Sequence, residues 1–122
     1  MHKLSIVLLA VILFCCVQLG STTAGGLSET KIADEDCRNA VAAVKQTVVS
    51  QTRRNYSQFK AVEYKTQVVS GINYFVKVKV ASKEYLFLRI YKGFSPNYIL
   101  AGIRENKTEK DKIEYFEGNE EL

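Results

Sequence analysis

The chain has 122 residues, which is enough for one small domain and too few for two. Its 17 Lys and Arg residues exceed its 13 Asp and Glu residues, so the formal net charge is +4 at pH 7. The basic residues form no block of the kind that follows a phosphate backbone, which argues against a nucleic-acid-binding protein, and we expect no nucleic-acid partner.

Residues 1–24 predict a secretory signal peptide, which would make the protein a secreted one. A short basic start, Met1-His2-Lys3, precedes an uninterrupted apolar run from Ile6 to Val17, and small residues follow this run. We expect cleavage after Ala24, so that residues 25–122 form a single domain. The apolar run of 12 residues is too short to span a bilayer, which argues against the alternative of a retained single-pass anchor.

The domain after this leader contains no histidine and only one cysteine. A serine–histidine or cysteine–histidine nucleophile pair is therefore impossible, and so is a metal site that uses histidine. The acidic run Asp34-Glu35-Asp36 lies where a helix is expected to begin, so it is better interpreted as a helix cap than as an acid–base pair. We expect no enzymatic activity, no cofactor and no metal site.

A helix is predicted from Asp34 to about Arg54. This stretch opens with carboxylates, lacks glycine and proline, and ends with the positive charges that a helix C-terminus favours. Small apolar residues recur along one side of it with spacings of four, three and four residues: Cys37, Val41, Val44 and Val48. We interpret Cys37 as a buried small hydrophobe. The alternative is an intermolecular disulfide, because a single cysteine cannot form an internal one.

From Phe59 onward the hydrophobic period changes from that of a helix to the two-residue period of strands. The alternation predicts four strands, at residues 59–68, 72–80, 85–92 and 98–104. It assigns one face of the first two strands to Val62, Tyr64, Thr66, Val68, Ile72, Tyr74, Val76, Val78 and Val80. The charged tail after Glu105 keeps an apolar group, and part of it is expected to pack against the sheet. The predicted fold class is α+β, with one helix across one face of an antiparallel sheet.

Two N-x-S/T sequences are candidate N-glycosylation sites. They are Asn55-Tyr56-Ser57, directly after the predicted helix, and Asn106-Lys107-Thr108, at the start of the charged tail. A secreted chain would expose both to the glycosylation machinery if they lie on the surface.

The stretch Gln67-Val68-Val69-Ser70-Gly71 interrupts a long valine-rich strand pattern. A plain hairpin would need only a residue with positive φ, which Ser70-Gly71 supplies. The same five residues also resemble the Q-x-V-x-G first hairpin loop of the cystatin family, in which an apolar turn faces solvent. The surrounding sequence resembles the stefin branch of that family in AVEYKTQVVSGINYFVKVKV, GGLSE and ILAGIRENK.

This resemblance implies a cystatin fold over residues 25–122, with one long helix packed across a four- to five-stranded antiparallel sheet. It also implies reversible, tight-binding inhibition of papain-like cysteine proteases such as cathepsins, whose active-site cleft the inhibitor blocks without being cut. Carried over to this sequence, the protease-binding residues are Gly25 and Gly26 of an amino-terminal trunk, Gln67, Val68, Val69, Ser70 and Gly71 of the first hairpin loop, and Phe94, Ser95 and Pro96 of the second.

The sequence departs from the stefin pattern in two respects. Stefins usually lack a signal peptide and carry Leu-Pro-Gly in the second loop, whereas this chain has a leader and reads Gly-Phe-Ser-Pro-Asn at residues 93–97. It also lacks the two disulfides and the Pro-Trp loop of the other secreted branch. We therefore expect a secreted, stefin-like inhibitor. The alternative is a cystatin-fold protein that binds another ligand and inhibits no protease.

We expect a monomer. We also expect no membrane partner, because the positive charge is modest and is not gathered on an amphipathic helix. A β-branched residue at a tight loop tip, Val69, is an expected site of backbone strain. Straightening this loop would join its two flanking strands and exchange them between two copies. The resulting domain-swapped dimer would bury the first loop and should not inhibit.

Overall fold

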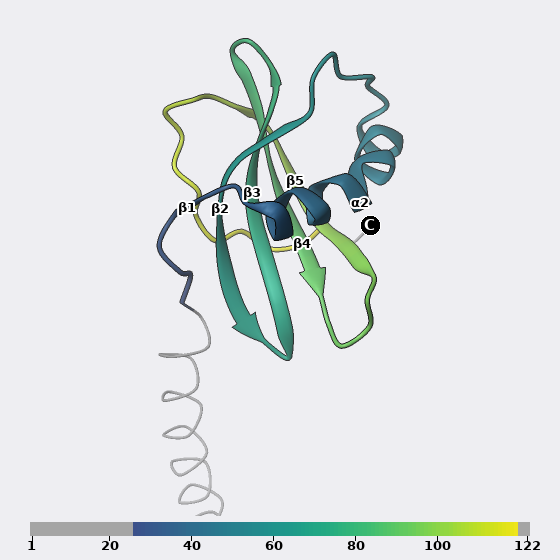
Figure 1. Cartoon of the computed structure of the whole chain (residues 1–122). Helices are drawn as coiled ribbons and strands as arrows, with labels where there is room; N and C mark the ends of the chain where they lie inside the picture. Colours follow the sequence, from purple (N-terminus) through teal and green to yellow (C-terminus); the bar gives the residue numbers. More distant parts are fainter. Residues whose placement is uncertain (1–25, 120–122) are drawn as a thin grey trace, which may run out of the picture.

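The computed structural model describes residues 26–119, so the predicted leader, Gly25 and the last three residues lie outside the described part of the chain. The elements follow in the order β1 (Lys31–Ile32), α2 (Glu35–Thr52), β2 (Lys60–Val69), β3 (Gly71–Ala81), β4 (Glu84–Lys92) and β5 (Tyr98–Lys107). The five strands form one antiparallel sheet in sequence order, and α2 crosses one of its faces (Figure 1). The predicted fold class is confirmed. The two-residue strand β1 was not predicted.

The helix α2 begins at a capped residue and ends at a residue with left-handed backbone. The Asp34 side chain accepts a hydrogen bond from the Cys37 amide at 3.0 Å and another from the Tyr64 hydroxyl at 2.8 Å, so the cap also ties the helix to β2. These bonds, that from the Cys37 amide foremost, hold the pKa of the Asp34 carboxyl below its usual value. Arg53 ends the helix at φ 57°.

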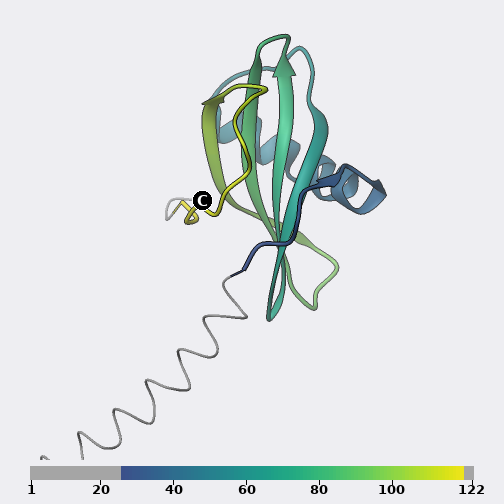
Figure 2. The same cartoon turned by 90° about the vertical axis from the view of Figure 1, so that its left-hand side faces the viewer.

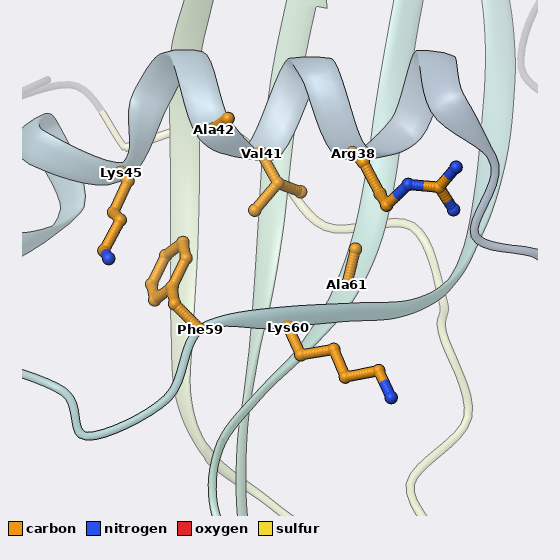
Figure 3. A pocket seen from close by; sticks show the side chains of 7 residues that line it. All are labelled: Arg38, Val41, Ala42, Lys45, Phe59, Lys60 and Ala61. Carbon is orange, nitrogen blue, oxygen red and sulfur yellow. The ribbon is translucent and has the colours of Figure 1, made fainter.

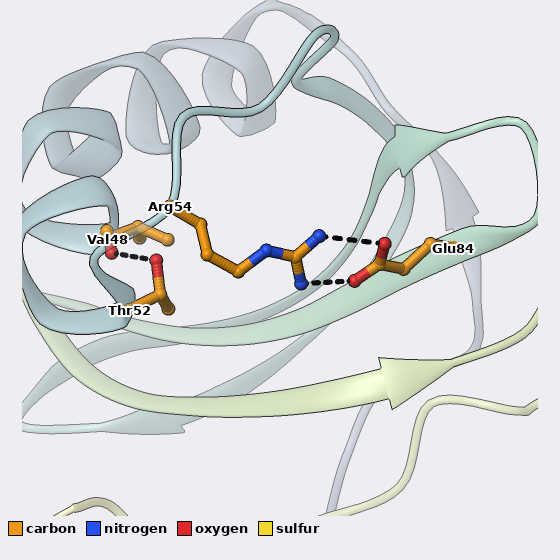
Figure 4. A network of polar contacts seen from close by, with 4 residues as sticks. All are labelled: Val48, Thr52, Arg54 and Glu84. Atoms are coloured by element: carbon orange, nitrogen blue, oxygen red, sulfur yellow. Dashed lines mark hydrogen bonds and ion pairs between the residues drawn. The ribbon is translucent and has the colours of Figure 1, made fainter.

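The predicted arginines follow the helix directly, with Arg53 as its C-cap. The last turn of α2 contains no basic residue. The guanidinium of Arg54 instead makes two hydrogen bonds to the Glu84 carboxylate, at 2.6 and 3.0 Å, while Thr52 bonds back to the Val48 carbonyl (Figure 4). Arg54 therefore joins the end of the helix to the start of β4.

The main core lies between α2 and the sheet. Cys37 is fully buried there, as predicted, and it is a free thiol. Burial raises the pKa of this thiol to about 12, so the thiol stays protonated. Burial also keeps a cysteine of another chain from reaching it. The other buried residues of this cluster come from every element except β1: Ala40, Val41, Val44, Val48, Ala61, Tyr64, Tyr74, Val76, Val78, Val80, Leu86, Leu88, Ile90 and Leu100.

The opposite face of the sheet is covered in part by the chain after β5, as expected. Ile113 is buried between Phe75 and Phe87, with Leu27 and Phe116 at the border of this second cluster. The ammonium of Lys77, on the same face, donates to the backbone carbonyls of residues 109 and 111. The tail thus closes a face that would otherwise expose aromatic side chains to water.

The facing of β2 differs from the predicted alternation. A β-bulge lies between Ala61 and Glu63, and as a result both Ala61 and Tyr64 are buried against the helix. The strict two-residue period had assigned Ala61 and Tyr64 to opposite faces. At the other end of the strand Val68 is exposed and Gln67 is buried.

Candidate functional site

Three segments that are distant in sequence meet at one end of the sheet. They are the β2–β3 hairpin, the β4–β5 connection and the beginning of the described chain, and both cartoon views place them at the same end (Figures 1 and 2). The antiparallel order of the strands produces this arrangement, because the β2–β3 and β4–β5 connections turn at this end and the β3–β4 connection turns at the other.

The first loop has a buried polar base and an exposed apolar tip. Gln67 and Asn73 are directly opposite in the ladder, both are buried, and the Asn73 amide donates to Gln67 Oε1 at 3.0 Å. This bond satisfies polar groups that would otherwise be costly to bury. Beyond it Val68 is 73% exposed and Val69 39% exposed, and Ser70 lies at the tip. The predicted residues of this loop are therefore held together as one rigid hairpin.

Gly71 carries the positive φ of this turn, at 115°, and Val69 does not share it. The expectation of backbone strain at Val69 was wrong in this respect, because the turn places its unusual conformation on the residue that tolerates it. A Cβ at Gly71 would lie 2.5 Å from the Lys92 carbonyl oxygen and 2.9 Å from Gly93 Cα. The side of Gly71 on which a side chain would stand thus faces the second loop of the same molecule.

Tyr91 also belongs to this end of the molecule, although the sequence reasoning did not single it out. It is the residue before the last of β4, and its hydroxyl donates a hydrogen bond to the Ser70 carbonyl at the tip of the first loop. The only sequence signal was its place in the two-residue alternation, two positions before Gly93. That signal cannot distinguish it from an ordinary surface tyrosine.

The second loop is the more exposed of the two. Phe94 is 96% exposed, and Ser95 and Pro96 are exposed as well. The loop has one local bond, from the Asn97 amide to Ser95 Oγ at 3.2 Å. Phe94 therefore presents nearly its whole side chain to solvent next to the first loop.

The trunk runs beside β2 and emerges near the first loop. The Ser28 amide donates to the Thr66 carbonyl at 2.8 Å, and the Thr66 amide donates to Ser28 Oγ at 2.9 Å. Thr66 immediately precedes the first loop, so the exposed Gly26, two residues before Ser28, lies next to that loop. Gly25, the other predicted trunk residue, is outside the described part of the chain.

Exposed large apolar side chains are concentrated at this end of the molecule. Those of the two loops and the adjoining strand ends are Val68, Val69, Ile72, Phe94 and Ile99. Apolar residues gathered in this way on a rigid end of a domain mark an interaction surface more often than isolated ones do.

The molecule also has a hollow of about 370 Å³ far from these loops, between α2 and the start of β2. Val41 and Ala61 point toward one another across it, with Phe59 at one side (Figure 3). Among residues 26–119 no three His, Cys, Asp or Glu side chains are grouped so that they could hold a metal ion. The loop end, which brings together most of the predicted site residues, is the candidate site.

Comparison with known proteins agrees with this layout. The Cystatin domain family matches residues 25–115. The chain is a member of the cystatin family. It is 43% identical over 95 residues to Cystatin-A2 of Dictyostelium discoideum, an alignment that covers 78% of this chain and 99% of that protein.

Two mammalian proteins support the stefin branch within the cystatins. Cystatin-A of Mus musculus is 40% identical over 94 residues, covering 75% of this chain and 97% of the relative. Cystatin-A of Homo sapiens is 36% identical over 95 residues, with the same coverage. Cystatins are inhibitors of cysteine proteases and not enzymes, so the chain belongs to an inhibitor family.

Proposed function

We propose that this cystatin is a secreted, reversible and tight-binding inhibitor of papain-like cysteine proteases of the cathepsin type. In this proposal the end of the sheet formed by the trunk, the first loop and the second loop enters the active-site cleft. The observation that carries it is the exposure of Val68, Val69 and Phe94 on two neighbouring strand connections at one end of the sheet. Rigid apolar side chains lose little conformational entropy when they dock, so more of the burial free energy contributes to affinity.

The hairpin also explains why the inhibitor would not be cut. A protease cleft binds its substrate as an extended strand, whereas the first loop is bent at a ladder pair between Val69 and Gly71. Extending it would break that pair and the buried bond between Gln67 and Asn73. The bound loop would therefore fill the cleft without presenting a peptide bond in the geometry that is attacked.

Secretion is proposed from residues 1–24, and a monomer is proposed as the active form. Recovery of the protein from the culture medium of a eukaryotic host, starting at Gly25 by mass spectrometry, is the expected result. A chain that stays in the cells with residues 1–24 attached would contradict it. The swapped dimer expected from the sequence would bury the first loop, so size-exclusion fractions should inhibit only where the monomer elutes.

Titration of papain with the purified protein tests the inhibitory function. We expect complete inhibition near one molecule per active site, recovery of activity on dilution, and an inhibitor that remains intact by mass spectrometry. Val68→Asp should weaken binding more than tenfold, because a charge would enter an apolar contact. Ser82→Asp, at the opposite end of the sheet, is the matched control and should bind normally. No inhibition at micromolar concentration would favour a cystatin-fold binding protein with another ligand.

A further inference from the structure

We infer that Tyr91 is a positioning residue that clamps the two hairpin loops to each other, so that they meet the protease as one rigid unit. This inference rests on the proposed function, because it concerns how the same binding end keeps its shape. Tyr91 lies on β4, between the loops, and is not among the residues that the cystatin pattern assigns to protease contact.

A hydrogen bond from Tyr91 holds the tip of the first loop. Ser70 lies beyond the last ladder pair of the hairpin, Val69 with Gly71, so the ladder does not hold its carbonyl. The Tyr91 hydroxyl donates to that carbonyl. Tyr91 itself lies near the end of β4, opposite Asn73 of β3 and Ile99 of β5. The tip of the first loop is thus anchored on the strand that leads into the second loop.

The backbone of both loops is closely packed around the Tyr91 hydroxyl. A Cβ at Gly93 would lie 2.8 Å from the Tyr91 hydroxyl oxygen and 3.1 Å from Cε2 of the ring. A Cβ at Gly71 would lie 3.0 Å from the same hydroxyl oxygen. Two glycines, one from each loop, therefore lie close to the tyrosine hydroxyl. We call Gly71, Tyr91 and Gly93 the loop clamp.

The clamp determines how the exposed residues are presented. Phe94 follows Gly93 directly and is almost fully exposed, so its position relative to Val68 depends on the packing of Gly93 against Tyr91. If the loops moved independently, each would have to be ordered on binding, and the bound state would be less favourable by that entropy. Within one interface such a change appears mainly as faster dissociation.

Tyr91→Phe is the direct test, because it removes the hydroxyl and keeps the ring beside Gly93. We expect dissociation from papain to become about 3- to 10-fold faster, which corresponds to the loss of one hydrogen bond. Tyr115→Phe is the matched control, because it also removes one tyrosine hydroxyl, which accepts its hydrogen bond from Arg89 and not from a loop residue. It should leave the dissociation rate unchanged, and both variants should keep the far-ultraviolet spectrum of the parent.

Amide hydrogen exchange in the free protein gives a readout that is independent of inhibition. Exchange should rise in residues 68–72 and 93–97 of Tyr91→Phe and should not rise there in Tyr115→Phe. Unchanged exchange in both segments, or a Tyr91→Phe dissociation rate equal to that of the parent, would overturn the clamp. If the parent itself does not inhibit papain, the proposed function fails, and the exchange result still decides whether the clamp exists.

A double-mutant cycle tests the claim that the loops act together. Tyr91→Phe and Phe94→Ala should be non-additive in their effect on dissociation, because the clamp acts partly through the position that it gives Phe94. Full additivity of these two substitutions would contradict the inference. Gly93→Ala serves as a second variant, since its methyl group would displace the Tyr91 ring and should loosen both loops while the strands remain intact.

Discussion

At the residue scale, the glycine of the first loop acts within the molecule. Its φ of 115° is a conformation that side-chain-bearing residues rarely adopt, and its open side faces the Lys92 carbonyl and Gly93. A glycine in a binding loop can also allow close approach of a protease backbone. The structure shows that the space is already occupied by the second loop.

Gly71→Ala should therefore affect the free protein as well as its complexes. We expect a loss of about 1–3 kcal/mol in the free energy of unfolding, from backbone strain and from the clash with Lys92, together with weaker inhibition. Ser70→Ala is the control, because only the Ser70 carbonyl is bonded and alanine retains it. Urea denaturation and papain inhibition would be measured on both. Unchanged stability of Gly71→Ala combined with weak inhibition would restore direct contact between Gly71 and the protease.

At the scale of elements, the sequence predicted one helix and four long strands, and the structure has all five. The stripe of Cys37, Val41, Val44 and Val48 sufficed for the helix, because a three-to-four-residue spacing is specific to it. The bulge at Ala61 was not predicted, because a two-residue hydrophobic period does not show where an extra residue is inserted. The strand β1 was not predicted, because two residues are too few to show a hydrophobic period.

Residues 108–119 contain no helix or strand, yet we expect them to stabilise the whole domain. Ile113 is 1% exposed and fills the space between Phe75 and Phe87. Ile113→Ala should lower the free energy of unfolding by about 2–5 kcal/mol, through lost burial and a residual cavity. Glu114→Ala, at the exposed next position, should have little effect, and both can be compared by urea denaturation. Equal stability of the two variants would show that this segment does not contribute to the core.

At the scale of the whole molecule, the two ends of the sheet differ in the segments that they bring together. One end gathers the trunk and both loops. The other contains the turn at Ser82 and Lys83, the Arg54–Glu84 ion pair and the last residues of β5. The position of the first loop could be predicted from the sequence, because the Q-x-V-x-G pattern is local. The clamp could not, because it joins residues about 20 positions apart whose contact depends on strand register.

Both candidate glycosylation sites lie at the end opposite the loops. Asn55 is exposed in the connection between α2 and β2, next to the ion pair of Arg54. Asn106 is exposed beside Lys107, which pairs with Tyr85 at the start of β4. A glycan at either position would therefore lie away from the loop end that we propose binds the protease.

We expect glycosylation of the secreted protein to leave inhibition unchanged. Protein from a eukaryotic host should show added mass that Asn55→Gln and Asn106→Gln remove separately. The glycosylated, enzymatically deglycosylated and doubly substituted forms should dissociate from papain at rates that agree within about twofold, because rates within one interface change only when its contacts change. Slower association of the glycosylated form alone would mean that the protease reaches the far end of the sheet. That result would contradict an orientation in which only the loop end enters the cleft.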